Sequence, residues 1–269
     1  SLENSSWNLN LWGEDLIAAI RNGAIYYWDT SGGIGNRASL VSTIADAAGV
    51  PSIVRTTTIS FPDRHFIAGG CQEYAVGGGG DVDPMLVRWS NQEDFTVFGP
   101  TALNTAGDQR LQIGTKIVAM VSSREETIIS TDEAIYGMTF VGAPFIFSFR
   151  LLAVNAGAAG LNTMINIDGN VFWMGRRNFF SYDGVVKELV CPVQYYVFDR
   201  MQTDMIDKTV VGHNKKFKEI TWFYVSNDNS AGTINPEPDS YVTYNYVENA
   251  WSIGTMDRTV WSDSFGARD

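Results

Sequence analysis

A short strand, a tight polar turn and a second short strand recur along this chain, with aromatic residues on both sides of the turn. The pattern occurs at residues 86–98, 179–190 and 242–253. One supersecondary unit repeated at intervals of tens of residues is typical of radial or stacked all-β architectures. The repeat therefore predicts an all-β fold. The repeat also favours a structural role over an enzymatic one, because such repeats often serve as scaffolds.

The composition agrees with an all-β chain of substantial size. The 269 residues are 45% hydrophobic and 13% aromatic, with 26 Gly and only 8 Pro. Aromatic residues suit strands, where flat side chains pack on a pleated surface. The length allows one large domain or two ordinary ones. Because no Pro/Ser-rich linker or shift in composition divides the chain, we predict a single propeller-like domain over residues 1–269.

The net charge of −11 argues against a basic surface for conventional DNA binding. An acidic surface keeps a protein soluble and repels nucleic acid at long range. Two interpretations stay open: an ordinary acidic protein, or a surface past which DNA must slide without sticking.

Cysteine usage and hydropathy argue against a disulfide-rich secreted protein and against a membrane-spanning protein. Only Cys71 and Cys191 are present, and we interpret both as free, small, buried residues, although one disulfide is arithmetically possible. No apolar run approaches the roughly 18–20 residues of a membrane span. The chain begins with Ser1 and shows no secretory signal, so we expect a processed or excised piece of a longer protein.

Turn dipeptides predict the clearest hairpins. Asn22-Gly23 separates strands at 16–20 and 24–28, and Asp168-Gly169 separates strands at 163–167 and 171–174. Further strand pairs are expected at 116–122 with 126–130 and at 216–225 with 241–246, the latter across an exposed loop at 226–240. Apolar residues at helical spacing predict two short helices, at 39–48 and 193–207.

The spacing of these units predicts the architecture. Units near Leu16, Phe66, Ile117, Met164 and Ile220 lie about 50 residues apart, close to the length of a four-stranded propeller blade. We therefore predict an irregular β-propeller of about five to six four-stranded antiparallel blades. A strand at 7–11 without its hairpin and a strand starting at 259–263 suggest ends that are cut inside a repeat or that meet to complete one blade.

Several residue patterns that suggest chemistry are incomplete. The run Gly77–Gly80 resembles a phosphate loop, but Asp81 follows it instead of Lys and Ser or Thr. Asp81 and Asp83 have calcium-like spacing without the further oxygen ligands. His65 and His213 have no Cys, His or Glu at ligand spacing, and we interpret them as strand-edge residues. We predict no catalytic, cofactor-binding or metal-binding residues, and no cofactor.

A propeller glycoside hydrolase acting on host surface polysaccharide is the best enzymatic alternative, and it needs two carboxylates about 5–10 Å apart. The candidate carboxylates are Asp15, Asp94, Asp132, Glu133 and Asp183. Most lie at predicted turns, where Asp is common for local hydrogen bonding. Two basic groups, Arg176-Arg177 and the lysines at 215, 216 and 218, are interpreted as solvated turns or subunit contacts.

Several strings along the chain resemble the phage tail nozzle family, also called tail tubular protein B. They are WGEDLIA at 12–18, GAIYYWD at 23–29, DPMLVRWSNQEDF at 83–95, TAGDQRL at 105–111, PFIF at 144–147, YDG at 182–184, and YNY at 244–246 with Asn249 and WSIG at 251–254. Related virion hub and packaged-DNA stabilisation proteins contain similar strings. The resemblance covers nearly the whole chain, with the motifs in order.

The resemblance implies a non-enzymatic part of a virion with a β-propeller at its centre. Six copies would form the distal tube of a short, non-contractile phage tail. The implied partners are further copies of the chain, the tail adaptor and the tail fibres, while DNA passes through without sequence-specific binding. The implied location is the virion, after synthesis in the host cytoplasm. Trp89 and Trp251, which lie in these strings, are expected to close the apolar seams between blades. A generic protein-binding propeller remains an alternative.

Overall fold

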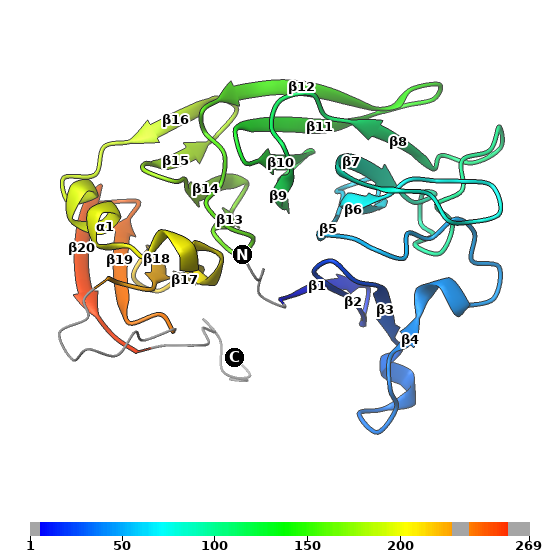
Figure 1. Ribbon diagram of the computed structural model, residues 1–269, viewed down its shortest axis with the longest axis horizontal. Coiled ribbons are helices and arrows are strands. Elements are labelled where there is room, and N and C mark those ends of the chain that lie inside the picture. The colour runs from blue at the N-terminus through cyan, green and yellow to red at the C-terminus, as the bar shows by residue number, and fades with distance from the viewer. Residues whose placement is uncertain (1–5, 228–236, 258–269) are drawn as a thin grey trace. The chain divides into compact units, whose positions relative to one another are not determined.

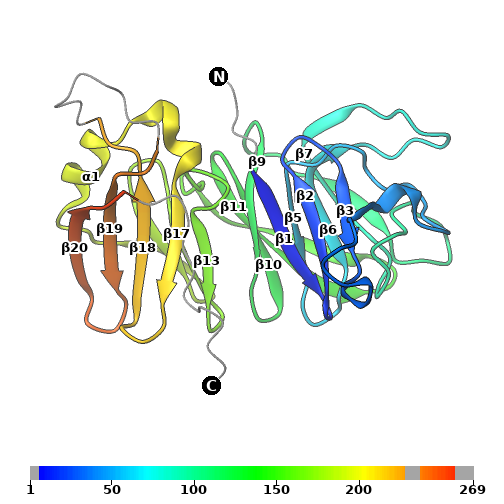
Figure 2. The same ribbon diagram turned by 90° about the horizontal axis from the view of Figure 1, so that it is seen from below.

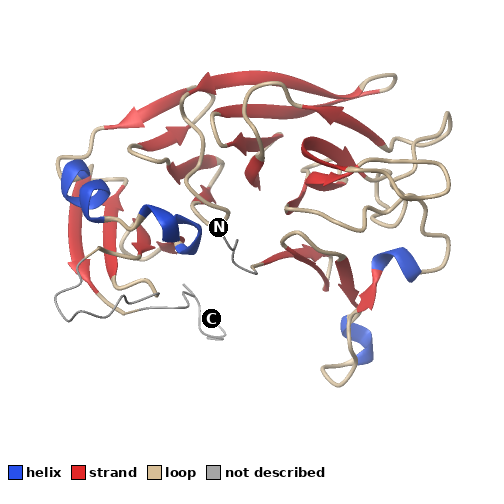
Figure 3. Ribbon diagram, in the orientation of Figure 1, coloured by secondary structure: helices blue, strands red, loops and turns tan. Residues whose placement is uncertain are grey.

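The computed structural model describes residues 6–227 and 237–257 and contains five four-stranded antiparallel sheets (Figures 1 and 3). Sheet one comprises β1 (Trp7–Trp12), β2 (Asp15–Ile20), β3 (Ile25–Trp28) and β4 (Ser39–Leu40). Sheet two comprises β5 (Thr56–Ile59), β6 (Phe66–Gln72), β7 (Val82–Trp89) and β8 (Gly107–Arg110). Sheet three comprises β9 (Ile117–Ser122), β10 (Glu126–Thr131), β11 (Ala134–Gly142) and β12 (Ile146–Val154).

Sheets four and five lie in the second half of the chain. Sheet four comprises β13 (Met164–Ile167), β14 (Asn170–Met174), β15 (Phe179–Tyr182) and β16 (Val186–Leu189). Sheet five comprises β17 (Val210–Asn214), β18 (Glu219–Tyr224), β19 (Ser240–Asn245) and β20 (Ala250–Thr255), which run side by side in Figure 2. In every sheet the strands follow chain order, so each sheet is a meander of hairpins.

The residues group into two compact units. Asn4–Gly157 forms one unit with sheets one to three, and the other begins at Ala158 and holds sheets four and five. The prediction of a single domain over residues 1–269 stays a prediction.

Alternation along each strand builds the cores of the first unit. Phe66 and Ala68 of β6 pack with the core of sheet one, whereas Ile67 between them packs with Ile117 and Ile129 of sheet three. Successive side chains of a strand point to opposite faces, so one strand supplies two cores. Trp89 adds ring contacts with Phe147 of β12 at a centroid distance of 5.2 Å.

The core of the second unit lies between sheets four and five. Phe179 of β15 lies 5.0 Å from Trp222 and 4.8 Å from Trp251 between ring centroids. Val197 of α1 (Gln194–Arg200) is buried in the same cluster, as is Met201. Trp89 and Trp251 therefore close seams between neighbouring sheets within their own units, as the sequence predicts.

Most predicted hairpins are confirmed. Asn22 has φ +57° at the turn between β2 and β3, and Asp168 and Gly169 have φ +52° and +90° between β13 and β14. The pairs β9–β10 and β18–β19 also form, as do the repeats at 179–190 and 242–253. The helix prediction at 193–207 is confirmed by α1 and the 3₁₀ helix η3 (Thr203–Lys208).

The predicted helix at 39–48 is wrong. Ser39 and Leu40 form β4, which pairs with β3, and only the 3₁₀ turn η2 (Val41–Thr43) follows. A further 3₁₀ turn, η1 (Thr30–Gly32), precedes β4. The apolar spacing is real, since Val41 is buried and Ile44 packs in the same core, but it arises from a strand and turn. Backbone hydrogen bonds to β3 make the extended form preferable for this short segment.

The first repeat, at 86–98, is not a hairpin. The outer neighbour of β7 is β8, whereas residues 95–98 belong to the connection between β7 and β8 and bridge to Ala48 through Val97. The sequence of β8, Gly-Asp-Gln-Arg, is polar because most of this edge strand is exposed. The hydrophobic pattern therefore predicted the wrong pairing partner for β7.

At the N-terminal end, the expected strand without a hairpin partner does pair with a neighbour. The strand at 7–11 is part of β1, which pairs with β2 and completes sheet one. The expected strand at 259–263 and most of the loop at 226–240 lie outside the described residues.

Candidate functional site

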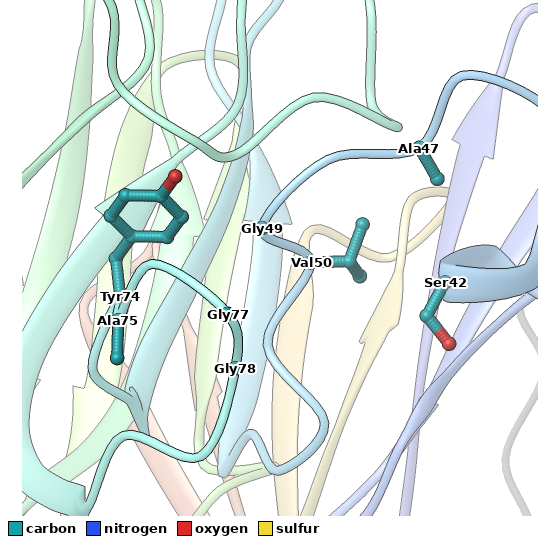
Figure 4. Close-up of a pocket in the computed structure, with 8 residues that line it drawn as sticks. All are labelled: Ser42, Ala47, Gly49, Val50, Tyr74, Ala75, Gly77 and Gly78. Atoms are coloured by element: carbon teal, nitrogen blue, oxygen red, sulfur yellow. The ribbon is translucent and has the colours of Figure 1, made fainter.

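A pocket of about 270 Å³ opens beside the Gly-rich loop that joins β6 to β7 (Figure 4). It is lined by Ser42, Ala47, Gly49, Val50, Tyr74, Ala75, Gly77 and Gly78. Gly77, Gly78 and Gly79 have φ between +83° and +92°, a conformation that favours glycine. The loop lets the chain reverse beside Tyr74, whose ring forms one wall in Figure 4.

Glycine is required at position 49, directly beside the ring of Tyr74. Its φ is +66°, and a Cβ atom there would lie 2.7 Å from the Gly99 nitrogen and 2.8 Å from the ring of Tyr74. The carbonyl oxygen of Ala48 accepts hydrogen bonds from the Phe98 and Gly99 nitrogens at 2.7 and 3.0 Å. The pocket wall is therefore a close backbone contact between two loops.

A buried cation joins the loops around this pocket. The guanidinium of Arg88 donates to the carbonyl oxygens of Gly49, Gln72 and Phe98 at 2.7, 2.9 and 3.1 Å. It also lies 5.6 Å from the ring centroid of Tyr74. Arg88 is 1% exposed, and burial lowers its pKa, yet guanidinium stays charged in proteins.

The lining of this pocket offers few groups for catalysis. Its lining is backbone, small side chains and one tyrosine, and the charge of Arg88 is directed to carbonyl oxygens.

A smaller pocket of about 100 Å³ lies on the second unit. Its lining is Arg176, Arg177, Gln194, Tyr195, Phe198, Asp199 and Thr203. Gln194 donates to the Arg177 carbonyl oxygen at 2.8 Å, which fixes the basic turn against α1. Arginine and exposed tyrosine are typical of protein contact surfaces.

A third pocket of about 290 Å³ lies on the first unit, between β8 and sheet three. It is lined by Gln109, Arg110, Leu111, Gln112, Ile113, Tyr136, Phe149 and Leu151. Arg110 is held by an ion pair with Asp83 at 2.6 Å. Asp83 also accepts from the Met85 nitrogen at 2.8 Å, so it is used in structure and not with Asp81 as a calcium pair.

His65 is not the strand-edge residue that the sequence suggested, since it is fully buried. Its Nδ1 lies 2.6 Å from Asp63 Oδ2, and its Nε2 lies 3.0 Å from Thr105 Oγ1. Ser60 Oγ donates to the same Asp63 oxygen at 2.6 Å. Burial opposes ionisation of Asp63, but the bonds from His65 and Ser60 prevail and lower its pKa.

The hydrogen-bonded series Ser60, Asp63, His65 and Thr105 resembles a catalytic carboxylate–histidine–hydroxyl arrangement. Here, its hydrogen bonds hold loops together. Thr105 Oγ1 also accepts from the Gln92 nitrogen at 2.8 Å and its own nitrogen donates to Asn91 at 3.0 Å. The network therefore pins the connection between β7 and β8 to the turn before β6. His213, the second histidine, lies 3.2 Å from the Tyr246 hydroxyl.

The candidate carboxylates of the hydrolase alternative serve separate local structures. Asp15 accepts from Tyr27 and Thr30, and these bonds lower its pKa. Asp94 accepts from Thr96, and Asp132 accepts from Thr115 and Lys116.

Asp183 forms an ion pair with Lys187 at 2.7 Å. Glu133 follows Asp132 in the turn between β10 and β11.

The clustering of ligand-type side chains and the state of the two cysteines were compared with the prediction. There, no group of three or more His, Cys, Asp or Glu side chains gathers as a metal site. Cys71 and Cys191 are free and buried, as predicted. Burial raises the pKa of Cys71 to about 12 and that of Cys191 to about 11, so both thiols are protonated at neutral pH. Within the same residues, no helix has the length and hydropathy of a membrane span.

Sequence reasoning missed Arg88 and the His65 network. A signal for Arg88 was available, because it interrupts the apolar run Met85–Trp89, where a charge must be paired or hydrogen-bonded. The spacing of Ser60, Asp63 and His65 gives no comparable signal, since Thr105 joins them only through the fold.

Comparison with known proteins is informative about the fold. No family model matches the chain, and no curated protein is significantly similar to it. The computationally designed propeller Ika8 matches with a TM-score of 0.50 and 12% identity over 91% of this chain and 60% of that chain. YCF48 bound to a D1 peptide matches with a TM-score of 0.46 and 10% identity, over 94% of this chain and 68% of that one.

A putative gluconolactonase matches with a TM-score of 0.44 and 11% identity over 91% of this chain and 71% of that chain. At these identities the likeness concerns the fold alone. This chain spans about 60% of the length of Ika8. The all-β class with four-stranded propeller blades, predicted from the repeat, is confirmed, with five blades among the described residues.

Proposed function

We propose that this chain is a structural component of a short phage tail, where copies assemble into the nozzle through which DNA leaves the virion. The proposal starts from the ordered strings that resemble the tail nozzle family. It includes a homo-hexameric tube with the tail adaptor and tail fibres as partners.

The observation that carries the proposal is where the resembling strings lie. Residues 83–95 and 105–111 contain Arg88, Trp89, Asn91 and Thr105, which form partly buried hydrogen bonds between sheet two and its connections. Trp251 and Tyr244 pack at 4.5 Å, and the Tyr244 hydroxyl donates to Asn249 at 3.0 Å. The residues in these strings thus maintain packing and loop geometry. This is the role expected of residues shared within a family of structural proteins.

Charge supports a conduit role. DNA is a polyanion, and each lysine or arginine contact to a phosphate adds affinity that must be broken as DNA moves. The net charge of −11 minimises such contacts. We expect the surface facing the tube axis to be acidic or neutral.

Labelling of virus particles tests the proposal. Antibodies against this chain, visualised with gold by electron microscopy, should mark the distal end of a short tail on particles released by infected cells. An antibody against the capsid protein is the matched control. Particles that carry capsid label but none on the tail would refute the role.

A further inference from the structure

Two adjacent arginines line the small pocket of the second unit. Arg176 and Arg177 lie in the turn between β14 and β15, and both side chains are exposed. Within residues 6–227 and 237–257, neither guanidinium forms a hydrogen bond or an ion pair. The chain has 30 Asp and Glu residues against 19 Lys and Arg residues. The pair is therefore a local concentration of positive charge in an acidic protein.

The backbone that carries this pair is fixed in place. Gln194 Nε2 donates to the carbonyl oxygen of Arg177 at 2.8 Å and to Asn178 Oδ1 at 2.5 Å. Phe198, which also lines the pocket, packs against Phe179 at a ring-centroid distance of 5.3 Å. Groups that are already ordered lose less freedom when a ligand binds. The turn and the apolar wall of the pocket are thus largely preorganised.

The size of the pocket limits what can enter it. Its volume of about 100 Å³ is that of roughly three water molecules, whereas pockets for small-molecule ligands usually exceed about 300 Å³. One short side chain fits, but a sugar ring or a nucleotide does not. Tyr195 lines the same pocket and is 80% exposed, so its ring is available to a neighbouring residue of the ligand. These features favour an extended peptide that inserts one side chain.

Charge selects the side chain. The lining contains two arginines and one acid, Asp199, so its net charge is +1. Asp199 also forms no hydrogen bond or ion pair among the described residues. A single carboxylate neutralises the lining, and guanidinium groups pair with carboxylates through two parallel hydrogen bonds. A phosphate group carries a charge of about −2 at neutral pH, exceeds the available positive charge and is repelled by Asp199.

We propose that this pocket binds the carboxylate side chain of an acidic peptide segment on a partner protein. Arg176 and Arg177 hold the carboxylate, and Tyr195 packs against the residue beside it. Asp199 accepts a hydrogen bond from a peptide N–H of the partner. Because the attraction is between exposed charges, salt weakens the binding. All the lining residues belong to the second unit, and the proposal does not rest on the tail role.

Nuclear magnetic resonance of the arginine Nε–H signals in the 269-residue chain tests the proposal. The probes are the dipeptides N-acetylglutamyl-phenylalanine amide and its neutral counterpart, N-acetylglutaminyl-phenylalanine amide. The glutamyl probe should have a dissociation constant at least about fivefold lower at low salt, the range of an exposed ion pair with good geometry. A phosphoseryl probe of the same length should bind no more tightly than the glutamyl probe.

A pair of double variants locates the site. Arg176→Gln/Arg177→Gln should abolish the preference for the glutamyl probe. The matched control, Lys215→Gln/Lys216→Gln, removes the same charge from the exposed turn between β17 and β18 and should retain the preference. Circular dichroism establishes that both variants are folded.

Three outcomes would overturn the proposal. One is equal affinity of the wild-type chain for the glutamyl and glutaminyl probes, including no binding of either at millimolar concentration. Another is a preference for the glutamyl probe that survives in the folded arginine variant. The third is tighter binding of the phosphoseryl probe, which would show that the pocket does not select a carboxylate.

Discussion

The buried cation Arg88 offers the sharpest test of how sheet two is held together. Its guanidinium donates to three carbonyl oxygens, those of Gly49, Gln72 and Phe98. Gly49 and Phe98 lie in two separate connections of the first unit, and Gln72 is the last residue of β6. We consider Arg88→Met, which keeps the apolar stem and removes every donor.

Two opposing effects decide how much Arg88→Met changes the free energy of unfolding. Hydrogen bonds from a charged donor contribute about 1.5–3 kcal/mol each, and the three carbonyl groups lose their partner in the variant. Against this, removal of a buried charge relieves a desolvation cost of several kcal/mol. Nε of Arg88 lacks a hydrogen-bond partner within the described residues, so the charge is incompletely compensated. We expect Arg88→Met to lower the free energy of unfolding of the first unit by about 2–4 kcal/mol.

Hydrogen exchange measured by mass spectrometry is the appropriate assay. It reports the opening of β6 and β7 separately from the second unit, so the two compact units need not unfold together. The matched control is Arg110→Met on β8, whose side chain is 60% exposed and pairs with Asp83 at 2.6 Å. An exposed ion pair contributes at most about 1 kcal/mol.

If Arg88→Met changes the opening of β6 and β7 no more than Arg110→Met does, the three hydrogen bonds do not stabilise this unit.

Four further predictions concern other parts of the chain. Gly49→Ala should lower the free energy of unfolding by about 1–3 kcal/mol, because it adds a backbone clash to the strain of positive φ. Gly33→Ala, at φ +74° with open space around it, should cost less, and equal melting temperatures would contradict this. The lowered pKa of Asp63 stabilises the fold above about pH 4, and this contribution disappears as the pH falls through the folded-state pKa. Urea unfolding should therefore show Asp63→Asn less stable than wild type near neutral pH and equally stable in strong acid, and a difference independent of pH would count against the His65 network. Cys71, whose pKa is raised to about 12 by burial, should resist thiol reagents at pH 8 until urea unfolds the chain, so rapid labelling of the folded protein would be unexpected. Gel-shift assays should give dissociation constants for duplex DNA no tighter than about 1 μM at physiological salt, and submicromolar binding would contradict the conduit role.

Hairpins were predictable where local chemistry decides them. Asn22, Asp168 and Gly169 adopt positive φ in these tight turns, a conformation that few other residue types tolerate. Aromatic residues such as Trp251 were predictable as seam residues because their large apolar area must be buried.

Pairing at sheet edges was not predictable from hydrophobic pattern. The polar strand β8 and the two-residue strand β4 are held by backbone hydrogen bonds to β7 and β3, which depend little on side-chain type. The apolar segment at 95–98 looked like a better strand than Gly107–Arg110, yet it packs as part of a loop.

The polar interior was the hardest part to predict. His65, Asp63 and Thr105 are separated by up to 42 residues and meet only after sheet two has formed. The sequence around His65 does not indicate which residues become its hydrogen-bond partners. The pocket beside Gly49 depends likewise on two loops that approach through backbone atoms.

Single-particle electron microscopy of the purified protein is the most direct test of the proposed six-fold tube. We expect a ring of six copies around an axial channel whose wall is acidic or neutral. The absence of a six-fold ring, or a channel wall lined with arginine and lysine, would contradict it.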